Sequence, residues 1–98
     1  MKIPRQVTVG GKKISVVLED LTNTDCVGYY LHDQLKIGIC STLSDCEKIK
    51  TLKHETMEAC LFISGVAWCE TIETEAVVRA FEELFFEAWE AIEKKLND

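Results

Sequence analysis

The spacing of the apolar residues changes once along this chain of 98 residues, and that change most limits the folds it can adopt. Up to Cys40 the apolar residues occur in short β-branched and alternating runs, which are typical of strands that bury one face. From Ser44 onward they recur every three or four residues, which is typical of amphipathic helices. Strands followed by helices predict an α+β fold.

The first forty residues predict four strands in two hairpins. Residues 5–9 and 13–18 are rich in β-branched side chains, and Gly10 and Gly11 between them can take the positive φ angles of a tight turn. Residues 26–31 and 35–40 form a second pair around the turn sequence HDQ. We therefore expect a small antiparallel four-stranded sheet.

Two helices should follow the strands. Ser44 and Glu47 form a capping box that begins the first helix, and Gly65 is suited to end it. The second helix should begin at Thr71 or Thr74. Its expected inward face consists of Val78, Phe81, Phe85, Ala88, Ile92 and Leu96. We expect both helices on one face of the sheet, in a single domain of residues 1–98.

Charge and composition exclude several classes of protein. The net charge is −6 and acidic residues concentrate after position 69, so a basic surface for nucleic acid is not expected. No apolar run predicts a membrane span or a signal peptide, which favours the cytoplasm. Five cysteines without a C-x-x-C pair indicate reduced, mostly buried thiols and argue against a disulfide framework.

The stretch HETME, residues 54–58, is the strongest candidate for chemistry. His54 and Glu58 are four residues apart, so both project from one helix face and could hold a cation. Glu55 is displaced by about 100°, where a zinc peptidase helix carries its general base. A third ligand would come from the start of the second helix. We favour Glu75 over Glu73, because Glu75 lies three residues before Val78 on the expected inward face.

Four stretches in order resemble the small zinc metallopeptidases of phages and prophages, the minigluzincin type, over essentially the whole chain. They are VTVGGKKISVVLED, CVGYYLHDQLKIGICSTLS, TLKHETMEAC and TEAVVRAFEELFFEAW. The resemblance implies a zincin-like fold. It also implies that His54 and Glu58 stand at the two helix ligand positions, that Glu55 is the general base, and that Glu75 or Glu73 is near the third ligand.

Glu58 departs from that pattern, which has histidine at this position. One imidazole and two carboxylates would quench the Lewis acidity of zinc and favour harder ions such as manganese or magnesium. Three interpretations stay open: an active peptidase using an HExxE site, a non-catalytic site for zinc or another divalent metal, and a remnant without metal. We favour the remnant without a cofactor, because the lost histidine removes a bond that the chemistry needs.

The function expected from this combination is binding to another protein by a catalytically degenerate scaffold. The resemblance to phage proteins implies a partner in the host cell cytoplasm, such as an enzyme or defence component that the protein inhibits. Phe86 and Trp89 fall outside the main inward stripe of the second helix, among acidic residues. The expected partner surface is Glu82, Glu83, Phe86, Trp89 and Glu90, and its aromatic residues would also suit a homodimer contact.

Overall fold

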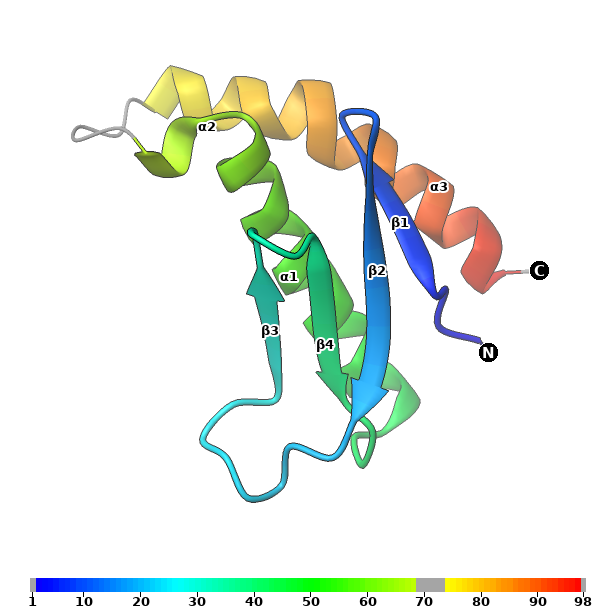
Figure 1. The fold of residues 1–98 in the computed structure, drawn as a ribbon. Coiled ribbons are helices and arrows are strands. Elements are labelled where there is room, and N and C mark those ends of the chain that lie inside the picture. Colours follow the sequence, from blue (N-terminus) through cyan, green and yellow to red (C-terminus); the bar gives the residue numbers. More distant parts are fainter. Residues whose placement is uncertain (1, 69–73, 98) are drawn as a thin grey trace.

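The computed structural model describes residues 2–68 and 74–97, with side chains in the second part from residue 76 onward (Figure 1). It confirms an α+β fold. The strands are β1 (Gln6–Val9), β2 (Lys12–Glu19), β3 (Gly28–Leu31) and β4 (Lys36–Cys40). The helical elements are α1 (Asp45–Ile63), η1 (Val66–Trp68), α2 (Thr74–Ala80), η2 (Phe81–Phe85) and α3 (Phe86–Leu96).

The sheet is mixed, with strand order β1-β2-β4-β3. Both expected hairpins are present, because β1 pairs with β2 and β3 pairs with β4 in antiparallel fashion. The expectation of an all-antiparallel sheet is wrong, since β2 and β4 pair in parallel. After β2, the loop of residues 20–27 leads to β3 at the outer edge of the sheet (Figure 1). The chain then turns back, and β4 lies between β3 and β2, parallel to β2.

Helices cover only one face of this sheet (Figure 1). α1 begins as expected: the Glu47 N–H donates to the Ser44 hydroxyl at 3.3 Å, and Gly65 after its end has φ of 88°. α1 packs on β3 and β4, while α3 packs on β1. No helix in residues 2–68 or 74–97 is long and apolar enough to cross a membrane. The fully buried side chains between sheet and helices include Val9, Ile14, Ile37, Ile39 and Leu52.

A π-helical turn, η2, interrupts the second helix between α2 and α3. Such a turn contains about one extra residue, so the buried positions before it are displaced by about one place. Phe85, Ala88 and Ile92 are buried as expected. The expectation for Val78 is wrong, because Val78 is 47% exposed and Ala80 is buried.

Candidate functional site

The candidate site lies where the edge strand β3 passes unusually close to α1. Gly28, at the start of β3, makes this approach possible: a Cβ at this position would collide with the Thr51 side chain and come within 3.0 Å of the Gly38 carbonyl oxygen. The same Cβ would lie 3.5 Å from a carboxylate oxygen of Glu55. A residue without a side chain therefore lets the strand cover Glu55.

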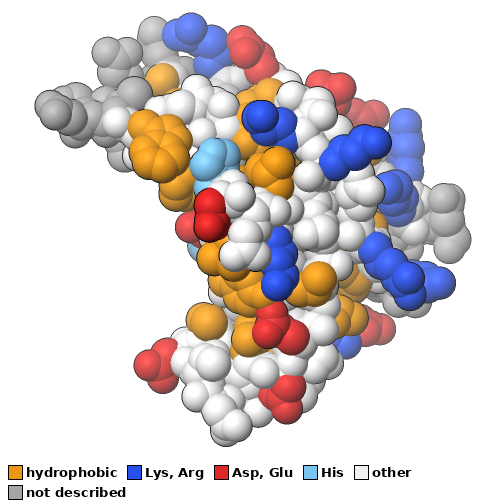
Figure 2. Space-filling view, in the orientation of Figure 1, with side chains coloured by type: hydrophobic (Ala, Val, Ile, Leu, Met, Phe, Trp, Pro, Cys, Tyr) orange, Lys and Arg blue, Asp and Glu red, His pale blue; other side chains and the backbone are white. Residues whose placement is uncertain are grey.

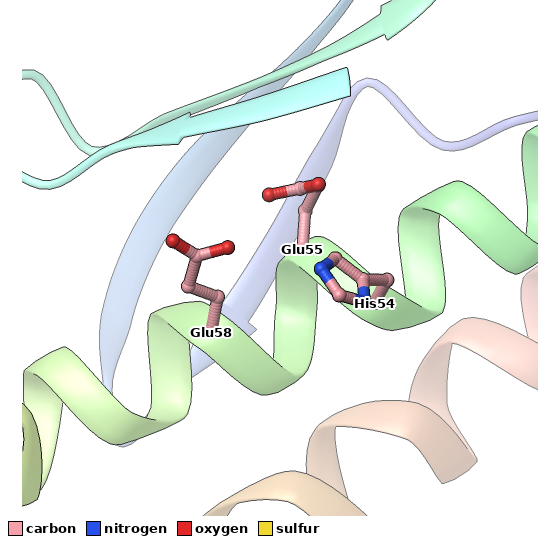
Figure 3. A group of neighbouring side chains, drawn as sticks. All are labelled: His54, Glu55 and Glu58. Atoms are coloured by element: carbon pink, nitrogen blue, oxygen red, sulfur yellow. The ribbon is translucent and has the colours of Figure 1, made fainter. Parts of the chain in front are cut away.

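His54, Glu55 and Glu58 of α1 come together as expected (Figure 3). One potential ligand atom from each residue lies within 4.8 Å of the other two. His54 is exposed, whereas Glu55 is only 6% exposed. Helix geometry explains the arrangement, because residues three and four apart share a face while Glu55 is turned toward β3.

Burial beneath β3 is the main reason why the pKa of Glu55 is raised from its ordinary value of 4.5 to about 7. The charge of Glu58 and a hydrogen bond to Glu58 raise this pKa further. In its protonated form, which this pKa favours below about pH 7, Glu55 donates a hydrogen bond from its O–H to the Glu58 carboxylate. In the described part of the chain, every buried side-chain nitrogen or oxygen has a hydrogen-bond partner.

The donor atoms of this cluster fit a catalytic zinc poorly. The three residues supply one imidazole and two carboxylates, and the residue expected as general base is itself hydrogen-bonded to the expected ligand Glu58. A zinc that activates water needs ligands that leave it a net positive charge and a base free to take the proton. One nitrogen with several oxygens is better suited to a harder divalent ion.

The expected third ligand, Glu75, has a side chain outside the described residues, and Glu70, Glu73 and Cys69 lie outside them entirely. The preference for Glu75 over Glu73 depends on an inward-facing Val78, and Val78 is exposed. The structure therefore unites His54, Glu55 and Glu58. Glu75 as the third ligand stays a prediction, and the position of Val78 no longer supports it.

A groove of about 430 Å³ opens beside the cluster, and sequence reasoning missed part of its lining. Its walls include His54 and Glu55 on one side and Asp25 and Cys26 from the loop before β3 on the other. That loop lies beside α1 only because β3 occupies the sheet edge. The sequence carries no local signal that would have assigned Cys26 to this place.

Among the cysteines that the structure describes, Cys40 and Cys60 are buried and Cys26 and Cys46 are exposed, and all four are free. The expectation of mostly buried thiols thus holds for two of the four. Burial raises the pKa of Cys60 to about 11, so this thiol is poorly suited to ionise and replace a lost metal ligand.

An aromatic cluster that the sequence did not predict lies at the C-terminal end of α1. His32 stacks on Phe62 with ring centroids 5.3 Å apart, and its Nδ1 lies 2.7 Å from the Tyr30 hydroxyl oxygen. Trp68 meets the edge of Phe62 at 5.5 Å and is 67% exposed. Although the turn sequence HDQ suggests an exposed histidine, His32 is half-buried among these rings.

The expected partner surface on the second helix is only partly available. Glu82, Glu83 and Glu90 are exposed, and Phe86 is 58% exposed. Trp89 is half-buried: it stacks on Phe85 at an interplanar angle of 9°, and the Lys53 Nζ lies 5.4 Å from its ring centre. Trp89 therefore packs mainly against Phe85 of the second helix, with Lys53 of α1 over its ring, whereas Phe86 is the exposed ring of the expected surface.

Comparison with known proteins gives no match, whether with protein-family models, curated proteins or solved structures. Function has to be inferred from the residues and their geometry.

Proposed function

We propose that this protein is a catalytically inactive, zincin-like protein that acts by binding another protein. The observation that carries the proposal is Phe86, a large apolar side chain that is 58% exposed on an acidic helix. Exposed aromatic rings are unfavourable in water and are enriched at protein interfaces. Two features of the HETME cluster support a protein without catalytic activity: Glu58 stands in place of a histidine ligand, and it accepts a hydrogen bond from Glu55.

The charges around Phe86 indicate the kind of partner. Glu82 and Glu83 are exposed in the π turn directly before Phe86, and Glu90 is exposed one α-helical turn after it, so carboxylates lie on both sides of the ring along the helix. An aromatic ring surrounded by carboxylates suits an apolar pocket bordered by lysine or arginine. The ring would supply most of the binding energy, and the carboxylates would supply the rate and specificity of association.

Glu58 supports a scaffold without peptidase activity. It replaces the expected histidine and forms a hydrogen-bonded pair with Glu55. A general base must be free to accept a proton from water, and the hydrogen bond to Glu58 favours the form of Glu55 that already carries one. The resemblance of the chain to phage peptidases adds a setting to this proposal: the partner is a host protein in the cytoplasm, and its inhibition is the biological outcome.

The direct test compares Phe86→Ser with a matched control, Val27→Ser. Val27 is a 54% exposed apolar residue outside the helix. Each variant would be immobilised and exposed to host cytosol, and proteins retained by the wild type would be quantified by mass spectrometry. We expect a specific protein to be lost with Phe86→Ser and with Glu83→Lys/Glu90→Lys, and kept with Val27→Ser. Equal retention by all variants would remove this helix from the proposal.

A metal-dependent peptidase is the second candidate, and two observations favour it. The potential ligand atoms of His54, Glu55 and Glu58 lie within 4.8 Å of one another, and a groove opens beside them. A pKa of about 7 also suits a general base at neutral pH. Metal analysis of protein purified without chelator separates the candidates. Stoichiometric zinc, together with peptide cleavage that is lost in Glu55→Gln, would replace the binding proposal with this one.

A further inference from the structure

The hairpin of β1 and β2 ends before β2 does. The last pair in their register is Gln6 with Ser15, followed by one bond of 2.8 Å from the Val16 N–H to the Arg5 carbonyl. Within residues 2–68 and 74–97, no backbone bond between Ile3 or Pro4 and β2 follows it. β2 continues to Glu19. Its last residues therefore have β4 on one side and no strand on the other (Figure 1).

The backbone groups exposed at this open edge belong to Leu18. The Ser15 N–H bonds to Leu35 and the Glu19 carbonyl accepts from Ser41, so alternate residues of β2 turn their backbone groups toward β4. Leu18 lies between these positions in the alternation and turns its N–H and C=O the other way. Within residues 2–68 and 74–97, neither group has a backbone partner. An unpaired strand edge of this kind is a template for one more strand.

A groove of about 590 Å³ lies along this edge, between the N-terminal segment and the start of α1. Its apolar lining includes Ile3 and Leu18, and Leu18 is 48% exposed. Its charged lining consists of three cations, Lys2, Arg5 and Lys48, and one carboxylate, Asp45. Basic side chains gather on the side of the molecule where β1 and β2 lie (Figure 2). The groove is therefore positive in a protein whose net charge is −6.

We propose that an extended, acidic segment of a protein partner binds in this groove as an added strand beside the end of β2. Its backbone pairs with the N–H and C=O of Leu18. An apolar side chain of the segment rests on Leu18, and its carboxylates meet Arg5 and Lys48. This site goes beyond the proposed function. The groove selects an acidic segment, whereas the acidic surface around Phe86 selects a basic partner.

The test uses a defined probe, the peptide acetyl-Glu-Val-Glu-Val-Glu-amide, with amide hydrogen exchange measured by NMR on the whole protein. We expect the Leu18 amide to exchange rapidly in the free protein and at least tenfold more slowly with saturating peptide. The Ser15 amide, already bonded to Leu35, serves as the internal reference. A peptide with methylated backbone nitrogens should bind more weakly, because it cannot donate to the Leu18 carbonyl.

Charge variants give a second, independent measurement. Arg5→Glu/Lys48→Glu should weaken peptide affinity on the order of tenfold, since two attractive contacts become repulsive. Lys12→Glu/Lys13→Glu changes the same charge at the other end of β2 and should have a smaller effect; circular dichroism confirms that both variants are folded. Each of the following results would overturn the proposal: no peptide binding, equal weakening by both double variants, or binding that leaves the Leu18 amide unprotected. Slow exchange of Leu18 in the free protein would also overturn it, because the chain's own N-terminal segment would then close the edge.

Discussion

Replacing Glu55 with glutamine should stabilise the protein at alkaline pH and have little effect near pH 5. The folded state holds the proton of Glu55 with a pKa of about 7, compared with the ordinary value of 4.5 that applies after unfolding. The difference between these values corresponds to about 3 kcal/mol. That figure is large beside the 5–15 kcal/mol by which domains are typically stable.

The direction follows from which state holds the proton. Below pH 4.5 Glu55 is protonated in both states, so its stabilising effect on the folded state is fully present. As the pH rises toward 7, the unfolded state releases the proton first and the free energy of unfolding falls by up to about 3 kcal/mol. Glutamine cannot ionise. Glu55→Gln should therefore avoid this loss and exceed the wild type above pH 7.

Urea denaturation followed by circular dichroism at pH 5 and pH 8 measures this difference. In thermal melts at pH 8 the gain should appear as a rise on the order of 10 °C in Tm. Glu90→Gln, an exposed glutamate on α3, is the matched control and should show no gain that depends on pH. Glu58→Gln should retain most of the wild-type pH dependence, because burial is the first cause of the raised pKa and the charge of Glu58 only the second.

One outcome would refute this reasoning. If Glu55→Gln lowers stability equally at pH 5 and pH 8, Glu55 is ionised and paired in the folded protein. Repeating the melts with a chelator then identifies the partner: a loss of wild-type stability on chelation would indicate a bound divalent cation in place of the proton on Glu55.

Three further predictions address the residues around the site. Gly28→Ala should lower the free energy of unfolding by about 1–3 kcal/mol in urea titrations, because its methyl group collides with Thr51; an unchanged value would mean that β3 is not held against α1. Glu58→His should bind zinc tightly by calorimetry if the second helix supplies a third ligand, whereas no binding would indicate that this ligand is absent. Burial and the hydrogen bond to Glu19 raise the pKa of Tyr29 to about 12, and burial also raises the pKa of Tyr30, so ultraviolet titration should show both tyrosines ionising above their ordinary pKa, with Tyr29 near pH 12. Glu19→Gln should lower the pKa of Tyr29 only in part, and a full return to the ordinary value would show that burial is not its main cause.

Local patterns predicted the elements and the centre of the site well. Alternating β-branched residues located the strands, Ser44 and Glu47 located the start of α1, and helix spacing placed His54 and Glu58 on one face with Glu55 beside them. Each of these features depends on residues close together in the chain. The physical rules that connect them to structure act over one or two turns.

Features that depend on distant residues were not predicted. β3 could pair with β2 or lie at the outer edge of the sheet, and no local pattern distinguishes these two positions. The parallel pairing of β2 with β4 was therefore not predicted. The π turn at Phe81–Phe85 likewise has no sequence signal in the apolar spacing. Its extra residue displaced the buried face before it, which explains why Val78 was assigned to the wrong side.

The parallel pairing of β2 with β4 also has a consequence for the order in which the chain folds. Each hairpin joins neighbouring strands, whereas the pairing that runs from Ser15 with Lys36 to Glu19 with Cys40 joins positions that enclose the whole loop and β3. Closing that longer loop costs more entropy than closing either turn. We expect both hairpins to form early and the parallel pairing of β2 with β4 to form late. α1 would pack on β3 and β4 before β2 pairs with β4.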